Sequence, residues 1–324
     1  MTNIDEVRAS APGRVNLIGD HTDYSGGLVL PMVIDCETTI TGTWTEEPCW
    51  TIASDDMPES AVISVPIGDP AAVQPGWARY VAGVVAEFET RGTKVPGFRG
   101  RIRTTIPIGS GLSSSAALEV AVAKIIMQAS PDSMAPTDIA RLCQRAERQA
   151  TGVPCGIMDQ LSIVSGRRGA ATLIDCHDLS IEYVDIPDDI EFDIRFVHDR
   201  ALADSAYSER VAQCTAVEEL IGPLRSANIG DLTRITSEVL QRRARHVVSE
   251  NQRVRDFAAA LRSTDYSVAG DLMTTSHWSM ARDYETSTPD MDRAVETALG
   301  EPGVLGARMT GGGFGGCIVV MRTR

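Results

Sequence analysis

A glycine- and serine-rich turn that leads into a strongly apolar helix constrains the fold of this chain more than any other feature. The turn spans residues 107–116, with the sequence PIGSGLSSSA, and follows a predicted strand at 98–105. The pattern over 113–128 is apolar nearly all round, which is typical of a helix that is buried on most sides. Predicted strands and helices are mixed in both halves of the chain around it, so we expect an α/β or α+β fold.

The start of this helix is suited to bind an anion. Gly109 and Gly111 let the backbone turn tightly and approach a ligand, while Ser113, Ser114 and Ser115 can supply hydroxyls and an N-cap. A helix start also presents unpaired N–H groups and the positive end of the helix dipole. The sequence lacks GxxxxGK[ST], which excludes the P-loop lysine mechanism. Taken alone, the turn also fits a structural cap on a buried helix.

The remaining pattern indicates two domains that both mix strands and helices. A chain of 324 residues is longer than one hydrophobic core usually organises. Helical spacing marks 76–90 and 136–150, and the pattern from 205 to 299 is almost entirely helical. Alternating or apolar runs predict strands at 6–10, 29–39, 50–54, 61–65, 170–174, 192–198, 306–310 and 317–321. We place the boundary near Leu173, which gives domains at 1–172 and 173–324.

Charge and cysteine usage exclude several classes of protein. The net charge is −14, and Lys94 and Lys124 are the only lysines, so we expect no nucleic-acid partner. The most apolar stretch, 116–127, contains Glu119 and is shorter than the roughly 20 apolar residues of a membrane span. The N-terminal segment carries acids and no apolar run, unlike a secretory leader. The seven cysteines form no CxxC pair, which predicts reduced thiols and a cytoplasmic location.

Three segments together resemble the sequence motifs of the GHMP small-molecule kinases. They are RVNLIGDHTDYSGG at 14–27, the turn at 107–116 and MTGGGFGG at 309–316. The first is similar to the galactokinase signature, and the resemblance continues at 154–166, 205–214 and 243–254. It implies an N-terminal ribosomal-protein-S5-like domain, a C-terminal ferredoxin-like α/β domain and an active site in the cleft between them. It also implies ATP-dependent phosphorylation of galactose at the anomeric hydroxyl, which yields α-D-galactose 1-phosphate and ADP.

The resemblance assigns the residues of phosphoryl transfer. It implies that Asp159 is the catalytic aspartate, within hydrogen-bond reach of the anomeric hydroxyl that it deprotonates or orients. It implies that Arg14 partners Asp159, holds its carboxylate ionised and stabilises charge on the transferring group. Ser115 and Glu147 match the metal positions, and their hard oxygens suit the Mg²⁺ that accompanies ATP. Without the resemblance, Asp159 and Arg14 fit solvated surface charges, and Glu147 fits a helix-surface acid.

The resemblance also assigns a nucleotide site and a sugar site. The nucleotide residues that it implies are Gly109, Ser110, Gly111, Leu112, Ser113, Ser114, Ser115 and Trp77. Trp77 also fits a core position, because it lies at helical spacing with apolar residues. The sugar residues that it implies are Asp20, His21, Thr22, Asp23 and Tyr207, with the substrate in the cleft. Five glycines within 311–316 indicate a backbone pressed against the nucleotide loop, and we expect the other four histidines to be structural or on the surface.

One departure from the family pattern bears on the substrate. Asp20 stands where the family usually has Glu, which withdraws the carboxylate by about 1.5 Å. That distance is enough to lose a direct hydrogen bond to the hydroxyl at carbon six. Either selectivity at that carbon is relaxed or shifted, or a water bridges the gap, so 1-kinases of arabinose or N-acetylhexosamines stay open as alternatives.

Two rival functions are disfavoured on the same motifs. A non-catalytic sensor of sugar and ATP would have a shortened serine loop, whereas residues 111–116 are intact and Asp159 is present. An isoprenoid kinase would need an apolar pocket for its substrate, and none is evident. The expected partners are therefore galactose and MgATP, with no membrane partner, and the chain is expected to be a monomer.

Overall fold

Segments that lie far apart in the sequence combine into two units. The computed structural model describes residues 6–130, 133–200 and 203–324. The first unit comprises Met1–Gly13, Ile34–Pro107 and Ser113–Ser165, and the second comprises Arg14–Val33, Ile108–Leu112 and Gly166–Arg324. Two short N-terminal segments thus group with the C-terminal half, and the domain boundary near Leu173 stays a prediction. No helix within the described ranges is both long and apolar enough to cross a membrane.

Antiparallel and parallel strand pairs build the sheet of the first unit. Two strands, β1 (Val7–Asn16) and β3 (Pro31–Thr45), pass from one unit into the other along the chain. In the first unit, β6 (Gly97–Thr104) pairs antiparallel with β3 and parallel with β4 (Cys49–Ser54). Strand β5 (Ala61–Ser64) pairs antiparallel with β4 and is the last strand of the order β3-β6-β4-β5.

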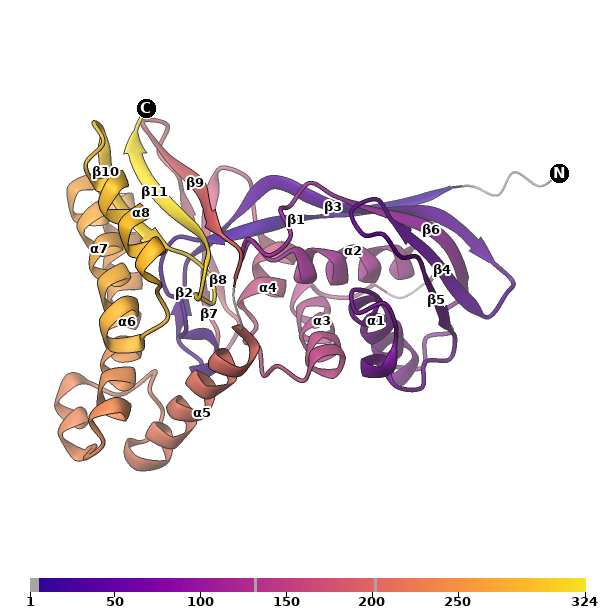
Figure 1. Cartoon of the computed structure of the whole chain (residues 1–324), viewed down its shortest axis with the longest axis horizontal. Coiled ribbons are helices and arrows are strands. Elements are labelled where there is room, and N and C mark those ends of the chain that lie inside the picture. The colour runs from indigo at the N-terminus through magenta and orange to yellow at the C-terminus, as the bar shows by residue number, and fades with distance from the viewer. Residues whose placement is uncertain (1–5, 131–132, 201–202) are drawn as a thin grey trace. The chain divides into compact units, whose positions relative to one another are not determined.

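Helices complete the first unit. Their bounds are α1 (Ala78–Thr90), α2 (Ser114–Gln128), α3 (Pro136–Thr151) and α4 (Met158–Ser165), with a short 3₁₀ turn η2 (Pro70–Ala72) before them. Helices α1, α2 and α3 lie on one side of the strands of this unit (Figure 1). Helix α2 is buried along most of its length, as its apolar pattern predicts. Gly83 lets α1 approach the backbone of Ala146 in α3, because a Cβ at that position would clash with it. Helix α3 ends at Gly152 in the left-handed conformation.

The second unit contains two groups of strands. Strand β7 (Ala170–Asp175) pairs antiparallel with β2 (Leu28–Val29), with β8 (Ile181–Asp185) and with Met32 of β3. The other group is a three-stranded antiparallel sheet in the order β10 (Val304–Met309), β11 (Gly316–Thr323), β9 (Ile190–His198). The two strands predicted on either side of the glycine cluster are therefore confirmed.

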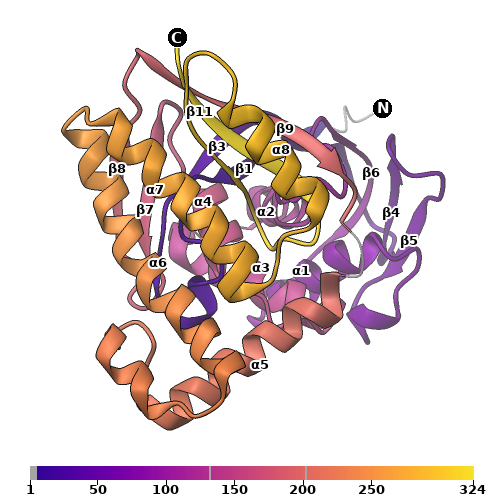
Figure 2. The ribbon, with the colours of Figure 1, turned by 60° about the vertical axis from the view of Figure 1, so that its left-hand side comes forward.

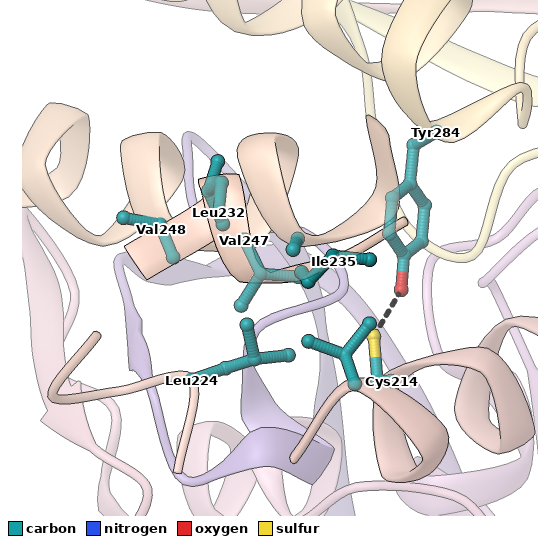
Figure 3. Close-up of a cluster of buried hydrophobic side chains, with 9 residues drawn as sticks. Cys214, Leu224, Leu232, Ile235, Val247, Val248 and Tyr284 are labelled. Atoms are coloured by element: carbon teal, nitrogen blue, oxygen red, sulfur yellow. Dashed lines mark hydrogen bonds between the residues drawn. The ribbon is translucent and has the colours of Figure 1, made fainter. Parts of the chain in front are cut away.

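Helices make up most of residues 205–299, as the sequence pattern predicts (Figure 2). The helices of the second unit are η1 (Asp23–Ser25), α5 (Ala203–Ile221), η3 (Ile229–Arg234), α6 (Glu238–Arg262), α7 (Tyr266–Ser279), the π-helical turn η4 (Met280–Tyr284) and α8 (Pro289–Leu299). One core cluster joins η4, α8 and the small sheet through residues such as Met280, Met291 and Val320. A second cluster packs α5 against α6 around Val247 and includes Tyr284 and Cys214 (Figure 3).

Candidate active site

A short helix positions Asp159 against the glycine–serine turn. Asp159 lies in the first turn of α4, and the irregular residues 152–157 precede it. Gln144 and Arg148 of α3 hold that segment through the carbonyl oxygen of Cys155. Ser113 then donates a hydrogen bond from Oγ to Oδ2 of Asp159, at 2.5 Å. The structure therefore brings Asp159 to the start of α2 within the first unit.

Ser113 does not have the capping role that the sequence predicts. It occupies the N-cap position of α2 but makes no side-chain cap hydrogen bond. Its backbone has φ of 63°, a left-handed conformation that is uncommon for a residue other than glycine. Because its hydroxyl is directed to Asp159, the first N–H groups of α2 receive no cap from this side chain. A helix start without that cap keeps its donors available to an anion.

A cluster of carboxylates lies beside Asp159. Ser115 donates to Oε1 of Glu147 at 3.2 Å, and the amide of Gln160 donates to Oε2 of Glu147 at 2.5 Å and to Glu119 at 3.0 Å. Burial raises the pKa of Glu147, and the negative charge of Asp159 raises it further. Burial also raises the pKa of Glu119 well above its usual value, with the charge of Glu147 adding to the effect. Burial and the neighbouring carboxylates thus disfavour the ionised forms of Glu147 and Glu119.

The oxygens of Ser115 and Glu147 fit a hard divalent cation. A hydroxyl and a carboxylate 3.2 Å apart are both oxygen ligands of the kind that Mg²⁺ prefers. Within the described residues no group of three or more His, Cys, Asp or Glu side chains is arranged to hold a metal ion. A cation at Ser115 and Glu147 would therefore complete its shell with water and phosphate oxygens, as Mg²⁺ commonly does.

In the second unit, the glycine-rich segment presses on the nucleotide turn. Four of its glycines have positive φ, and a Cβ on Gly316 would lie 2.6 Å from the carbonyl oxygen of Ser110. A Cβ on Gly311 would lie 3.0 Å from that of Gly111. Arg14 also holds the turn, because its Nη1 donates a hydrogen bond to the carbonyl oxygen of Gly111 at 2.7 Å. The glycines are needed because backbone meets backbone here, as the sequence predicts.

Asp20 is buried in an ionic network rather than exposed to solvent. Its Oδ2 lies 2.6 Å from Nη2 of Arg308, and its Oδ1 accepts from the N–H of Gly311 at 3.0 Å. Only 1% of Asp20 and none of Arg308 is accessible to solvent. Burial raises the pKa of Asp20, while the charge of Arg308 opposes this rise. Asp20 thus ties the sugar motif to the glycine-rich segment.

Glu250 of α6 anchors the same network. It accepts from the N–H of Gly19 at 2.9 Å and from the hydroxyl of Ser276 at 2.5 Å, and it pairs with Arg253 at 2.6 Å. Burial by itself raises the pKa of Glu250, but the charges led by Arg253 outweigh it and bring the pKa to about 2. This carboxylate therefore stays ionised and fixes the backbone that enters the sugar motif.

The other predicted sugar residues lie close together in the second unit. His21 has φ of 64°, and its ring centroid lies 5.5 Å from that of Tyr207 on α5. Asp23 is half-buried in the turn η1. The hydroxyl of Thr22 lies 2.8 Å from the Gly19 carbonyl oxygen and 2.7 Å from that of Leu28, so it stabilises the local turn. This engagement gives Thr22 a structural use in addition to the predicted one.

Trp77 lies in the first unit, directly before α1. It is half-buried, and its indole N–H donates to the carbonyl of Glu59 at 3.3 Å. Core positions of α1 are instead taken by Val81, Val84 and Phe88. A contact between Trp77 and adenine stays a prediction.

The predicted residues thus fall into two sets. The first unit holds Trp77, Ser113, Ser114, Ser115, Glu147 and Asp159, and the second holds Arg14, Asp20, His21, Thr22, Asp23, Gly109, Ser110, Gly111, Leu112 and Tyr207. The pairing of Arg14 with Asp159 stays a prediction. Sequence reasoning missed Glu119, Gln160 and Arg308, although a charged residue within an apolar helix or strand is a usable signal of a buried network.

Family models match three parts of the chain. The model described as the galactokinase galactose-binding signature matches residues 2–43. The model of the GHMP kinases N-terminal domain matches residues 79–167, and that of the GHMP kinases C-terminal domain matches residues 257–322. These ranges include the motif at 14–27, the glycine–serine turn, Asp159 and the glycine-rich segment.

Known proteins resemble the chain over nearly its whole length. Galactokinase of Bos taurus is 43% identical, over 98% of this chain and 83% of that protein. The crystal structure of Lactococcus lactis galactokinase complexed with galactose superposes with a TM-score of 0.91 at 33% identity, over 98% of this chain and 86% of that one. Mevalonate kinase of Methanococcus jannaschii shares the fold, with a TM-score of 0.73 at 20% identity, over 99% of this chain and 92% of that one. The chain therefore has the fold of a GHMP kinase and belongs to the galactokinase family.

Proposed function

We propose that the chain transfers the γ-phosphoryl group of ATP to the anomeric hydroxyl of galactose, giving α-D-galactose 1-phosphate and ADP. Membership of a kinase family implies the use of ATP. The observation that carries the proposal is the placement of Asp159, which Ser113 holds at the start of the helix that follows the glycine–serine turn. An acceptor of protons and a phosphate-binding helix start are the two groups that this transfer needs.

Asp159 acts on the sugar hydroxyl. The hydrogen bond from Ser113 fixes the orientation of its carboxylate, and the first turn of α4 fixes its backbone. A carboxylate held in this way accepts the proton of the anomeric hydroxyl, or orients that hydroxyl toward the γ-phosphorus. The positive charge of Arg14 stabilises the charge that develops on the transferring group.

Ser115 and Glu147 would hold the Mg²⁺ that accompanies ATP, and a bound ion would supply charge neutralisation at the phosphates. The amide of Gln160 fixes Glu147 by donating to its Oε2, so its other oxygen, which accepts from Ser115, is kept in place as a ligand. Residues 109–115 bind the phosphates through backbone N–H groups, and Trp77 contacts the base.

Asp20, His21, Thr22, Asp23 and Tyr207 read the sugar hydroxyls. The burial of Asp20 between Arg308 and Gly311 favours a second candidate of the same class, a 1-kinase for arabinose or an N-acetylhexosamine. A carboxylate that is already shared by a guanidinium and a backbone N–H has less capacity to select the hydroxyl at carbon six. We further propose a cytoplasmic location, which the seven unpaired cysteines support. We also propose that the chain is a monomer, which light scattering would check.

A panel of sugars tests the proposal directly. The purified chain is given MgATP with galactose, 6-deoxygalactose, arabinose, N-acetylgalactosamine, glucose or no sugar, and ADP release is followed. Phosphorus NMR of each product then identifies the phosphorylated carbon. We expect galactose to be the best substrate and to be phosphorylated at carbon one. A product phosphorylated at carbon six, or no ADP release with any sugar, would refute the proposal.

A further inference from the structure

A continuous chain of hydrogen bonds runs from His21 into the core of the second unit. Nδ1 of His21 lies 3.0 Å from the hydroxyl of Tyr24, and that hydroxyl lies 2.5 Å from the hydroxyl of Tyr284. The Tyr284 hydroxyl lies 3.0 Å from Sγ of Cys214, as the dashed line in Figure 3 shows. These four side chains come from three parts of the sequence, and none of the reactions above uses the last three.

Three of the four side chains are shielded from water. His21 is 4% exposed, Cys214 1% and Tyr284 0%, whereas Tyr24 is half-buried. Tyr284 ends the π-helical turn η4, and its ring centroid lies 4.8 Å from that of His21 and 4.6 Å from that of His246. Leu232, Val247 and other apolar side chains pack around the Cys214 end (Figure 3). Because water has little access to His21, Tyr284 and Cys214, their polar hydrogens need partners within the protein.

The chemistry of the four groups favours one direction of donation. Each hydroxyl carries a single hydrogen and donates only one bond, so a chain in which both tyrosine hydrogens are used within the chain has all its bonds pointing the same way. A neutral imidazole nitrogen is a strong acceptor, whereas a thiol sulfur is a weak one. Donation from Cys214 to Tyr284, from Tyr284 to Tyr24 and from Tyr24 to Nδ1 of His21 therefore uses the best acceptor last. The reverse direction would end on the weakest acceptor.

This direction has a consequence for the other nitrogen of His21. Burial, followed by the nearby charges of His246 and Arg200, lowers the pKa of His21 well below its usual value, so the ring is neutral. If Nδ1 accepts, the single ring proton lies on Nε2. Nε2 is buried and makes no hydrogen bond of ordinary length in the described residues, but the backbone of Gly312 interacts with the ring and opposes the lowering of its pKa. A donor that has only such a longer contact gains a full hydrogen bond when a ligand accepts from it.

We propose that Tyr24, Tyr284 and Cys214 are positioning residues that lock His21 in the Nε2–H tautomer and so make it a hydrogen-bond donor to a substrate hydroxyl oxygen. The assignment of the acceptor to the sugar rests on the function proposed above, whereas the tautomer does not. We call this chain of hydrogen bonds the relay: Cys214 donates to Tyr284, Tyr284 donates to Tyr24, and Tyr24 donates to Nδ1 of His21.

Nitrogen NMR of the free, full-length chain with ¹⁵N-labelled histidine tests the tautomer directly. The His21 signals are those that disappear in His21→Gln, and we expect a protonated Nε2 and an unprotonated Nδ1 at neutral pH. In Tyr24→Phe, which removes one oxygen, the two ¹⁵N shifts should move toward each other as the tautomers mix. Tyr266→Phe is the matched control, because its hydroxyl bonds to Asp189 outside the relay. A protonated Nδ1 in the wild type, or unchanged shifts in Tyr24→Phe, overturns the relay.

The thiol end supplies a second pair of variants. Cys214→Ser keeps a donor and should leave the His21 shifts as in the wild type, whereas Cys214→Ala should move them in the direction of Tyr24→Phe.

Kinetics then test the link to the substrate. We expect the KM for galactose to rise about tenfold in Tyr24→Phe, the effect of one hydrogen bond, with the KM for ATP unchanged. Failure of the wild type to phosphorylate any sugar would refute the function but leave the NMR result standing, so the two failures are distinguishable.

Discussion

Replacement of Arg308 by methionine should destabilise the second unit strongly. The Arg308 guanidinium is fully buried, with Nη2 2.6 Å from Asp20 and 3.8 Å from Glu250. Methionine keeps much of the volume but removes the charge. Breaking a buried ion pair from one side costs about 3–5 kcal/mol, because the remaining charge is left without compensation. We expect the free energy of unfolding to fall by about 3 kcal/mol, the lower end of this range. The loss is limited because Asp20 keeps its hydrogen bond from the N–H of Gly311 and Glu250 keeps its ion pair with Arg253.

The pH dependence of this loss identifies its origin. Burial raises the pKa of Asp20 and Arg308 opposes that rise, so removal of Arg308 raises the pKa further. A carboxyl whose pKa is higher in the folded state than in the unfolded state favours folding at low pH, and this contribution is lost as the pH rises through the folded pKa. The deficit of Arg308→Met should therefore be smaller at pH 6 than at pH 8.

Urea unfolding followed by circular dichroism measures the free energies at both pH values. Arg293→Met is the matched control, because Arg293 forms an exposed ion pair with Asp290 whose removal should cost less than about 1 kcal/mol. Equal losses in the two variants would show that the buried charge of Asp20 is not the cause. A deficit that does not shrink at pH 6 would refute the part of the reasoning that concerns protonation.

Three further predictions concern catalysis. Asp159→Asn should lower kcat at least a hundredfold while leaving the KM for ATP within about threefold, because it removes the acceptor and not the nucleotide contacts; a coupled ADP assay measures both. Gln160→Leu should raise the Mg²⁺ concentration needed for half-maximal activity by about tenfold, since Glu147 loses the bond that orients it; a Mg²⁺ titration at saturating galactose and ATP tests this. Asp20→Glu should sharpen the preference for galactose over 6-deoxygalactose and arabinose, and an unchanged ratio of kcat/KM would remove the explanation based on carboxylate length.

Local pattern predicts most of the elements of this fold. The spacing of apolar residues predicts α1, α2 and α3, and alternation predicts the strands from β3 to β7, because both signals depend only on neighbours in the chain. The pattern does not predict α4, because Pro154 and Gly156 interrupt the helical signal just before that helix begins. The grouping of 14–33 with the C-terminal half depends on tertiary contacts that no local pattern contains.

The candidate site shows the same limit. The motifs predict Asp159, Glu147 and Ser115 as a group, and the structure places them around one cluster in the first unit. The bond from Ser113 to Asp159 links residues 46 positions apart, so the sequence suggests a cap where tertiary structure supplies a different partner. Arg308 and Glu119 are charged residues in apolar segments, and only their partners, which lie far away in sequence, explain them.

The conformation of the sugar motif is set by residues more than two hundred positions away. Glu250 accepts from the N–H of Gly19, His246 lies 3.1 Å from the carbonyl oxygen of Asp20, and Arg308 neutralises the Asp20 side chain. A longer carboxylate at position 20 would have to displace Arg308 or Gly311 by about one bond length, on the order of 1.5 Å, because the pocket is closed. The change to Glu therefore acts on the glycine-rich segment as well as on the sugar. If the KM for ATP shifts together with the discrimination at carbon six, the two motifs are coupled through this one carboxylate.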